Sequence, residues 1–116
     1  MITGNQICIM VGGSGITINY VQVPSNCQIS TVRATCQAQA LAGSDTITIN
    51  DGTNDLGEAL FDAAPTAGEK ATYTPNATYG NTDLSENDVL TITTSAFGSS
   101  GDQAFVQIEL DPYALD

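Results

Sequence analysis

Apolar and polar residues alternate along most of this chain with a period of two, which is the pattern of half-buried β-strands. No stretch of a dozen residues keeps a helical period of 3.6 without a Gly or Pro inside it. We therefore predict an all-β protein. The predicted strands, each bounded by turn residues, are 6–11, 15–23, 27–40, 45–50, 71–74, 88–95 and 103–110.

The segment 55–64 is the only helix candidate. Its apolar stripe is formed by Leu56, Leu60 and Ala63 or Ala64. Gly57 weakens a helix at this place and Pro65 ends it. We expect a loop here, with at most one helical turn.

Two of the predicted strands change their apolar face part-way. A one-residue change of phase inverts every following side chain, so each change predicts a β-bulge or a crossing between sheets. In the strand 15–23, one side carries Ile16, Ile18 and Tyr20, and the other carries Val21 and Val23. In the strand 27–40, Ile29 is out of phase with Val32, Ala34, Cys36 and Ala38.

Long strands that bend at such points are typical of sandwiches and jelly rolls. The chain shows no linker, no charge run and no internal repeat, so we expect one domain over residues 1–116. The predicted fold is a single-domain antiparallel β-sandwich, jelly-roll-like. One shared core is expected to contain Ile47, Ile49, Leu90, Ile92, Val106, Ile108 and Leu110.

The charge balance narrows the possible functions. The 116 residues include 13 acidic side chains, only two cations (Arg33 and Lys70) and no His, which gives a formal net charge of −11. Nucleic-acid binding needs several cations to neutralise phosphates, so we do not expect a nucleic-acid partner. Proton transfer near neutral pH most often uses His, and no GxSxG motif is present. We expect no enzyme activity, no cofactor and no metal.

Targeting signals and cysteines give weaker information. The N-terminus has no basic region before its short apolar run, so we expect no export by a signal peptide. No apolar stretch approaches the roughly 20 residues of a membrane-spanning helix, and we expect no membrane partner.

Cys8, Cys27 and Cys36 each lie in an apolar β-like context, which favours buried thiols. A disulfide between Cys27 and Cys36 is the alternative.

Two groups of acidic residues were considered as cation sites, because Ca²⁺ takes six to eight oxygen ligands. The first group is Asp45, Asp51 and Asp55, and the second is Asp83, Glu86 and Asp88. Neither has the spacing of a calcium-binding loop. We interpret both as turn residues and solvated charges, with a cation at a subunit boundary as the alternative.

Several segments resemble a group of small β-sandwich virion proteins of tailed bacteriophages. The segment VQVPSNCQISTVRAT at 21–35 is similar to the group's extended strand, proline, polar turn and long strand. The segment GSDTITINDG at 43–52 is similar to its small-residue turn, Thr/Ile strand and Asp-Gly turn. Further similar segments are 71–78, 85–94 and 104–113, the last resembling the closing strand.

The resemblance implies a non-enzymatic virion protein that oligomerises. The leading expectation is a capsid decoration, or cement, protein on the capsid surface, made in the host cytoplasm. Its expected partners are the major capsid protein and itself, as a homotrimer at a local three-fold position. The alternative is a head-fibre, turret or tail component that binds the host surface or another virion protein. The candidate interface residues are Ile2, Arg33, Tyr113 and Leu115.

Overall fold

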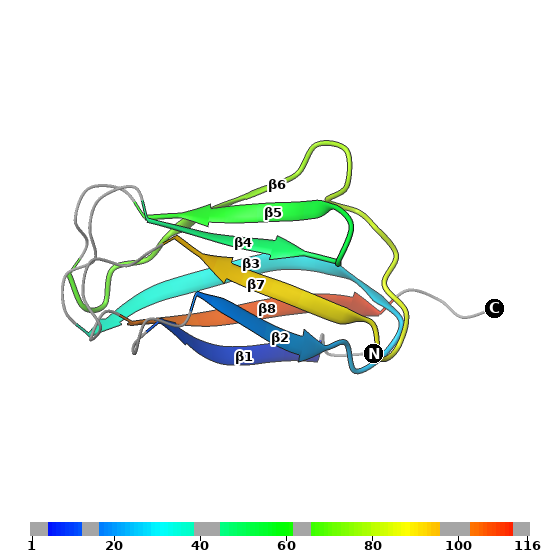
Figure 1. Ribbon diagram of the computed structural model, residues 1–116, viewed down its shortest axis with the longest axis horizontal. Coiled ribbons are helices and arrows are strands. Elements are labelled where there is room, and N and C mark those ends of the chain that lie inside the picture. The colour runs from blue at the N-terminus through cyan, green and yellow to red at the C-terminus, as the bar shows by residue number, and fades with distance from the viewer. Residues whose placement is uncertain (1–4, 13–16, 39–44, 62–65, 96–102, 113–116) are drawn as a thin grey trace.

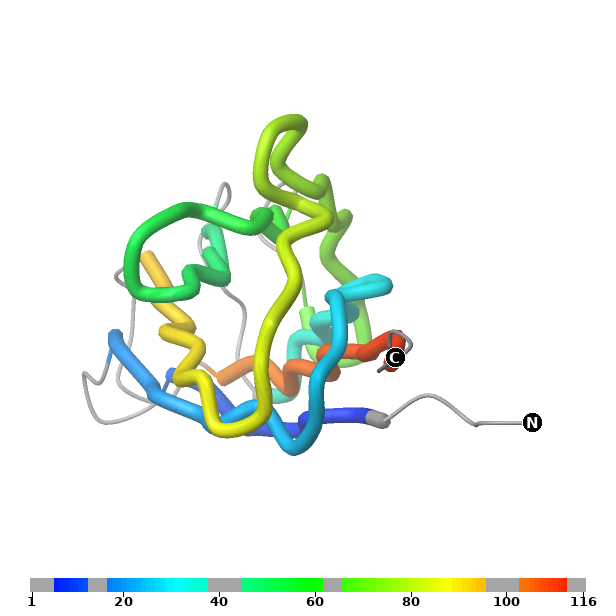
Figure 2. Tube along the Cα trace, turned by 90° about the vertical axis from the view of Figure 1, so that its right-hand side faces the viewer, coloured from blue at the N-terminus to red at the C-terminus, as the bar shows by residue number. Residues whose placement is uncertain are grey.

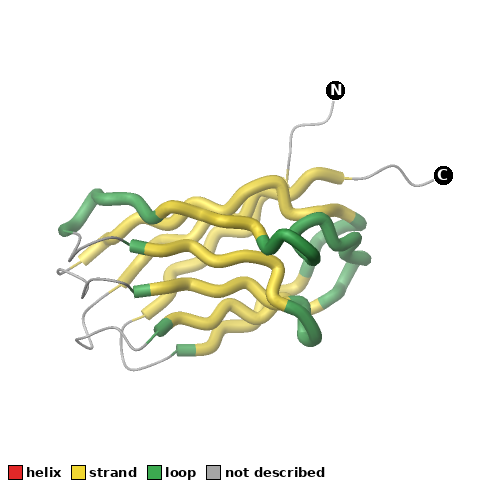
Figure 3. The backbone as a smooth tube through the Cα atoms, turned by 90° about the horizontal axis from the view of Figure 1, so that it is seen from above, coloured by secondary structure: helices red, strands yellow, loops and turns green. Residues whose placement is uncertain are grey.

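A computed structural model describes residues 5–12, 17–38, 45–61, 66–95 and 103–112. The described residues contain eight β-strands and no helix (Figures 1 and 3). The strands are β1 Asn5–Gly12, β2 Ile18–Gln22, β3 Cys27–Ala38, β4 Thr46–Asn50, β5 Asp55–Leu60, β6 Thr72–Pro75, β7 Val89–Thr94 and β8 Gln103–Pro112. No helix that could span a membrane is found in the described part of the chain.

The strands form two antiparallel sheets packed face to face, as the end-on view in Figure 2 shows. One sheet has the order β1-β8-β3, and the other has the order β2-β7-β4-β5-β6. We call them the three-stranded and the five-stranded sheet. The predicted single β-sandwich is confirmed.

The pairing is nested, as in a jelly roll. β1 pairs with β8, β2 with β7, and β4 with β5. The fourth nested pair is formed by β3 and residues 68–71, which lead into β6. In this pair, the Ala71 N–H donates to the Ala34 carbonyl at 2.8 Å. The segment from 68 to 75 therefore contacts both sheets and closes one side of the sandwich.

The core lies between the two sheets and is aliphatic. All seven residues predicted to share it are buried there, and they come from β4, β7 and β8. Further large side chains buried in it include Phe61, Leu56 and Leu84. Alternation alone placed the predicted seven correctly because each strand has only one face turned toward the opposite sheet.

The predicted change of face in the strand 27–40 is confirmed as a β-bulge. Ile29 pairs with Leu110 and Thr31 with Glu109, so Ser30 is the extra residue. The change predicted within 15–23 is wrong for the described residues, because β2 pairs with β7 in unbroken register from Ile18 to Gln22. There, both faces of one regular strand carry apolar side chains.

The loop predicted at 55–64 is also wrong over residues 55–60, which form strand β5; residues 62–65 lie outside the described part. β5 pairs with β4 on one side and with β6 on the other. A register shift leaves Leu56 as an extra residue, so Leu56 and Ala59 both face the core three positions apart. Apolar residues three positions apart also lie on one face of a helix, which is why the sequence of this strand has a helix-like pattern. Gly57 is required because a Cβ there would overlap the Tyr73 ring.

Truncating a core isoleucine tests the packing. We expect Ile92→Ala in β7 and Ile108→Ala in β8 each to lower the free energy of unfolding by about 2–5 kcal/mol, because each leaves a cavity between the sheets. Thr91→Ala, on the outer face of β7, is the matched control and should change it far less. Urea denaturation measures all three. Unchanged midpoints for both isoleucine variants would contradict the assigned core.

Candidate functional site

The structure does not bring the predicted interface residues together. Arg33 lies on β3, on the outer face of the three-stranded sheet. Ile2, Tyr113 and Leu115 lie outside the described residues. Their role at an interface stays a prediction.

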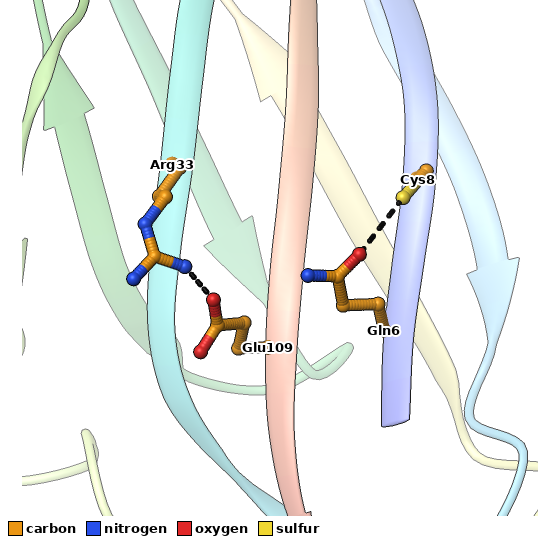
Figure 4. A network of polar contacts seen from close by, with 4 residues as sticks. All are labelled: Gln6, Cys8, Arg33 and Glu109. Carbon is orange, nitrogen blue, oxygen red and sulfur yellow. Dashed lines mark hydrogen bonds and ion pairs between the residues drawn. The ribbon is translucent and has the colours of Figure 1, made fainter. Parts of the chain in front are cut away.

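Arg33 forms an ion pair with Glu109 of β8 (Figure 4). The two residues are diagonal neighbours across the strand pair, since Arg33 is opposite Gln107 and Thr31 is opposite Glu109. The partner of Arg33 is thus a carboxylate of the same chain. The side chains are 57% and 32% exposed, so water competes with the pair and it contributes little to stability.

The cysteines differ in exposure. The expectation that all three are buried is wrong for Cys8, which lies on the outer face of β1 and donates to the Gln6 Oε1 atom at 3.4 Å (Figure 4). Cys27 and Cys36 are buried thiols. The alternative disulfide is ruled out because both lie in β3, nine positions apart. At about 3.3 Å per residue, their separation far exceeds the reach of a disulfide.

Burial raises the pKa of the Cys27 thiol above its ordinary value of 9.0, and the negative charge of Asp88 raises it further. Burial likewise raises the pKa of Tyr73 above 10.0. Both groups are neutral in the folded protein and ionise more readily when the chain unfolds. Neither is a nucleophile prepared for catalysis, because activation would require a lowered pKa.

Two of the acidic candidate cation ligands, Asp51 and Asp88, hold turns in place. Asp51 Oδ1 accepts from the N–H groups of Thr53 and Asn54, at 2.9 and 2.7 Å. Asp88 Oδ2 accepts from the Ser85 N–H at 2.8 Å. Among the described residues, no group of three or more Cys, Asp or Glu side chains is arranged to hold a metal ion.

The turns between β4 and β5 and between β6 and β7 lie at the same end of the sandwich (Figure 1). The first turn carries Asp51, and the second segment carries Asp83, Glu86 and Asp88. Both described cations lie elsewhere, since Arg33 is within β3 and Lys70 precedes β6. Among the described residues, four carboxylates thus lie in these two segments at one end, and most outward strand positions are uncharged.

Sequence reasoning missed an apolar patch on the outer face of the five-stranded sheet. Tyr20 is 68% exposed, Ile18 46% and Val89 43%. Ile18 and Tyr20 are two residues apart on β2, and Val89 lies diagonally across the β2–β7 pair from Tyr20. The signal was present in the sequence as apolar residues on both faces of 15–23, which was interpreted as a change of phase.

The side of the sandwich between β1 and β2 is less complete than the side closed by residues 68–71. Ile7 and Ile9 point toward the core but are only partly buried. The Nδ2 atom of Asn19, on β2, is buried and has no hydrogen-bond partner among the described residues. The side between β1 and β2 is therefore the second candidate interaction surface, after the apolar patch.

Comparisons with known proteins add no identification: no protein-family model, curated protein or solved structure matches this chain.

The pKa of Cys27 predicts how stability depends on pH. Because the thiol has the higher pKa in the folded state, its contribution to stability is complete below pH 9 and is lost as the pH rises above it. We expect the free energy of unfolding to fall above pH 9, and to fall less steeply in Cys27→Ala. Tyr73→Phe should flatten the decline at higher pH. Equal slopes in all three proteins, measured by urea denaturation from pH 7 to 11, would contradict this.

Replacing Arg33 measures the ion pair. We expect Arg33→Met to change the free energy of unfolding by about 1 kcal/mol or less, because both partners are partly exposed. Glu109→Gln should have a similarly small effect, and the double variant should equal either single one. Thermal unfolding at low and high salt provides the measurement. A loss of several kcal/mol would show that the pair is a structural requirement.

Proposed function

We propose that this protein is a non-catalytic structural subunit of a tailed-phage virion. Its specific role is that of a decoration protein, which binds the outer surface of the head and reinforces the contacts between capsomers. The proposal rests on the apolar patch of Ile18, Tyr20 and Val89, together with the resemblance of five segments to small virion sandwiches. The patch is the surface that would bind the major capsid protein.

The patch suits a protein partner. Exposed apolar residues scattered singly over a surface need no explanation, but neighbouring ones on a flat sheet face are typical of interaction sites. Tyr20 offers a large, rigid side chain, of the kind that often dominates the energy of an interface. Thr91 and Thr93 beside it are uncharged, so docking would bury no carboxylate there.

The distribution of charge supports attachment on the outside of a shell. A net charge of −11 repels packaged DNA and keeps particles apart in solution. Because the described turns place several carboxylates at one end of the sandwich, a sheet face can contact the shell without burying them. The proposal does not include the homotrimer, since the terminal residues predicted for its contacts lie outside the described part.

The alternative is a head-fibre, turret or tail component that binds the host surface. One observation favours it: Tyr79, in the turn after β6, is 40% exposed at the end of the sandwich, where a binding module would contact a ligand. Tyr73 belongs to β6, and its hydroxyl donates to the Leu56 carbonyl at 3.3 Å. It is therefore not available for such contacts.

Copy number distinguishes the two roles. We expect quantitative mass spectrometry of purified virions to find this protein in hundreds of copies, on the scale of the major capsid protein. A few copies per particle would instead support the fibre or tail role. Absence from the particles would overturn both.

Rebinding to stripped particles tests the surface. We expect Tyr20→Ser to weaken binding by about tenfold or more, because it removes the largest apolar side chain of the patch. Tyr79→Ser is the matched control and should bind normally. Loss of binding in the Tyr79 variant alone would move the contact to the turn at the end of the sandwich.

A further inference from the structure

β1 is the least protected edge strand of this sandwich. The outer edge of β3 is covered at both ends, by Leu84 near Cys27 and by residues 68–71. In the other sheet, the edge strand β2 has only five residues, and the edge strand β6 has four and ends in Pro75. β1, by contrast, is eight residues long and contains neither a charged residue nor a proline. Edge strands of monomeric proteins usually carry such features, because they prevent pairing with another chain.

The register shows which main-chain groups face the open edge. Ala34 accepts from residue 71 on the outer side of β3, so its main chain points away from β8. Ala34 is opposite Val106, and Val106 is opposite Ile9. Because main-chain groups alternate between the two sides of an antiparallel strand, Val106 and Ile9 face each other. The N–H and C=O groups of the alternate residues, Gln6, Cys8 and Met10, therefore point outward from the sheet edge.

The side chains beside this edge are incompletely covered in a single chain. Ile7 and Ile9 are partly exposed although they face the core, and Met10 is exposed on the outer face. Asn19, on the nearby strand β2, has a buried Nδ2 atom for which the described part of the chain supplies no acceptor. A further strand beside β1 would cover the two isoleucines.

We propose that β1 pairs in antiparallel fashion with β1 of a second copy of this chain, about a two-fold axis at Cys8. In this register, Ile7 of one copy is opposite Ile9 of the other on the inner face, and Gln6 is opposite Met10 on the outer face. Cys8 is opposite its own copy. The two three-stranded sheets join into one continuous sheet across the axis, which is the isologous arrangement of a C2 dimer.

The uncharged sequence of β1 and its self-matching register favour a second copy of this chain as the occupant. Two chains with a net charge of −11 repel each other, so they can associate only where their carboxylates are distant. β1 and β2 carry no charge. The proposed register is also self-complementary on the inner face, because it places Ile7 opposite Ile9. Added salt should strengthen the dimer by screening the remaining repulsion.

This inference does not depend on the proposed virion role, and a charge-swap experiment tests it. In sedimentation equilibrium, the wild-type protein should approach twice its 12.0 kDa chain mass as concentration rises. Cys8→Glu and Cys8→Lys should each weaken dimerisation by about tenfold or more, because like charges then face each other at the axis. An equimolar mixture of the two variants should restore the dimer, since Lys then faces Glu. Gln37→Glu, an exposed position on β3, is the matched control and should dimerise like the wild type.

Circular dichroism confirms that each variant is folded, and Met10→Glu is a second edge variant in case position 8 does not tolerate substitution. A wild-type protein that remains at 12.0 kDa at all concentrations would overturn the proposal, as would a trimer. Dimerisation unchanged by both edge variants would place the contact elsewhere. None of these results alters the copy number on virions, so the two proposals can fail separately.

Discussion

Nested antiparallel pairing is the constraint on which the rest of this structure depends. The innermost pair is the β4–β5 hairpin, and the outermost is β1 with β8. Between them, β2 pairs with β7, and β3 with the segment leading into β6. The chain is thus one long hairpin rolled over itself, and the rolling brings two sheets face to face. The core, the closed side and the open side all follow from this arrangement.

The described strands contain three register shifts, two in β3 and one in β5, and two of them decide which side chains face the core. The extra residues Ser30 in β3 and Leu56 in β5 shift the phase of the strands, so that apolar side chains keep facing the core as each strand bends. The bulge at Leu56 has a further use. Its carbonyl accepts from the Asn76 N–H at 2.9 Å and from the Tyr73 hydroxyl, which fixes the end of β6 against β5.

The sequence was sufficient to predict features that depend on alternation within one strand. The all-β class, the buried faces of β4, β7 and β8, and the bulge near Ile29 were predicted correctly for this reason. β5 was missed because an extra residue inside a strand produces a helix-like spacing. Contacts between segments far apart in the sequence could not be predicted either. The residues around Arg33, for example, give no sign that Glu109 is its neighbour.

The candidate surfaces could not be predicted for a related reason. A strand with apolar residues on both faces, such as β2, gives no local sign of which face is covered. Only the opposite sheet decides that Val21 and Val23 turn inward and that Ile18 and Tyr20 remain outside. The exposure of β1 likewise depends on the absence of a described strand beside it, which is a property of the whole roll.

The nested order has a consequence for how the chain folds. The turn at 51–54, held by Asp51, needs only a short loop to close, and each later pair can form on the one before it, so the entropy of closure is spread over many small steps. Proteins in which most contacts join residues far apart in the sequence still fold slowly, on the order of milliseconds to seconds. β1 must wait for β8, the last described strand along the chain. Until β8 has been synthesised, the least protected edge strand of this protein is therefore without its partner, and a chaperone or a fast route to assembly would have most effect there.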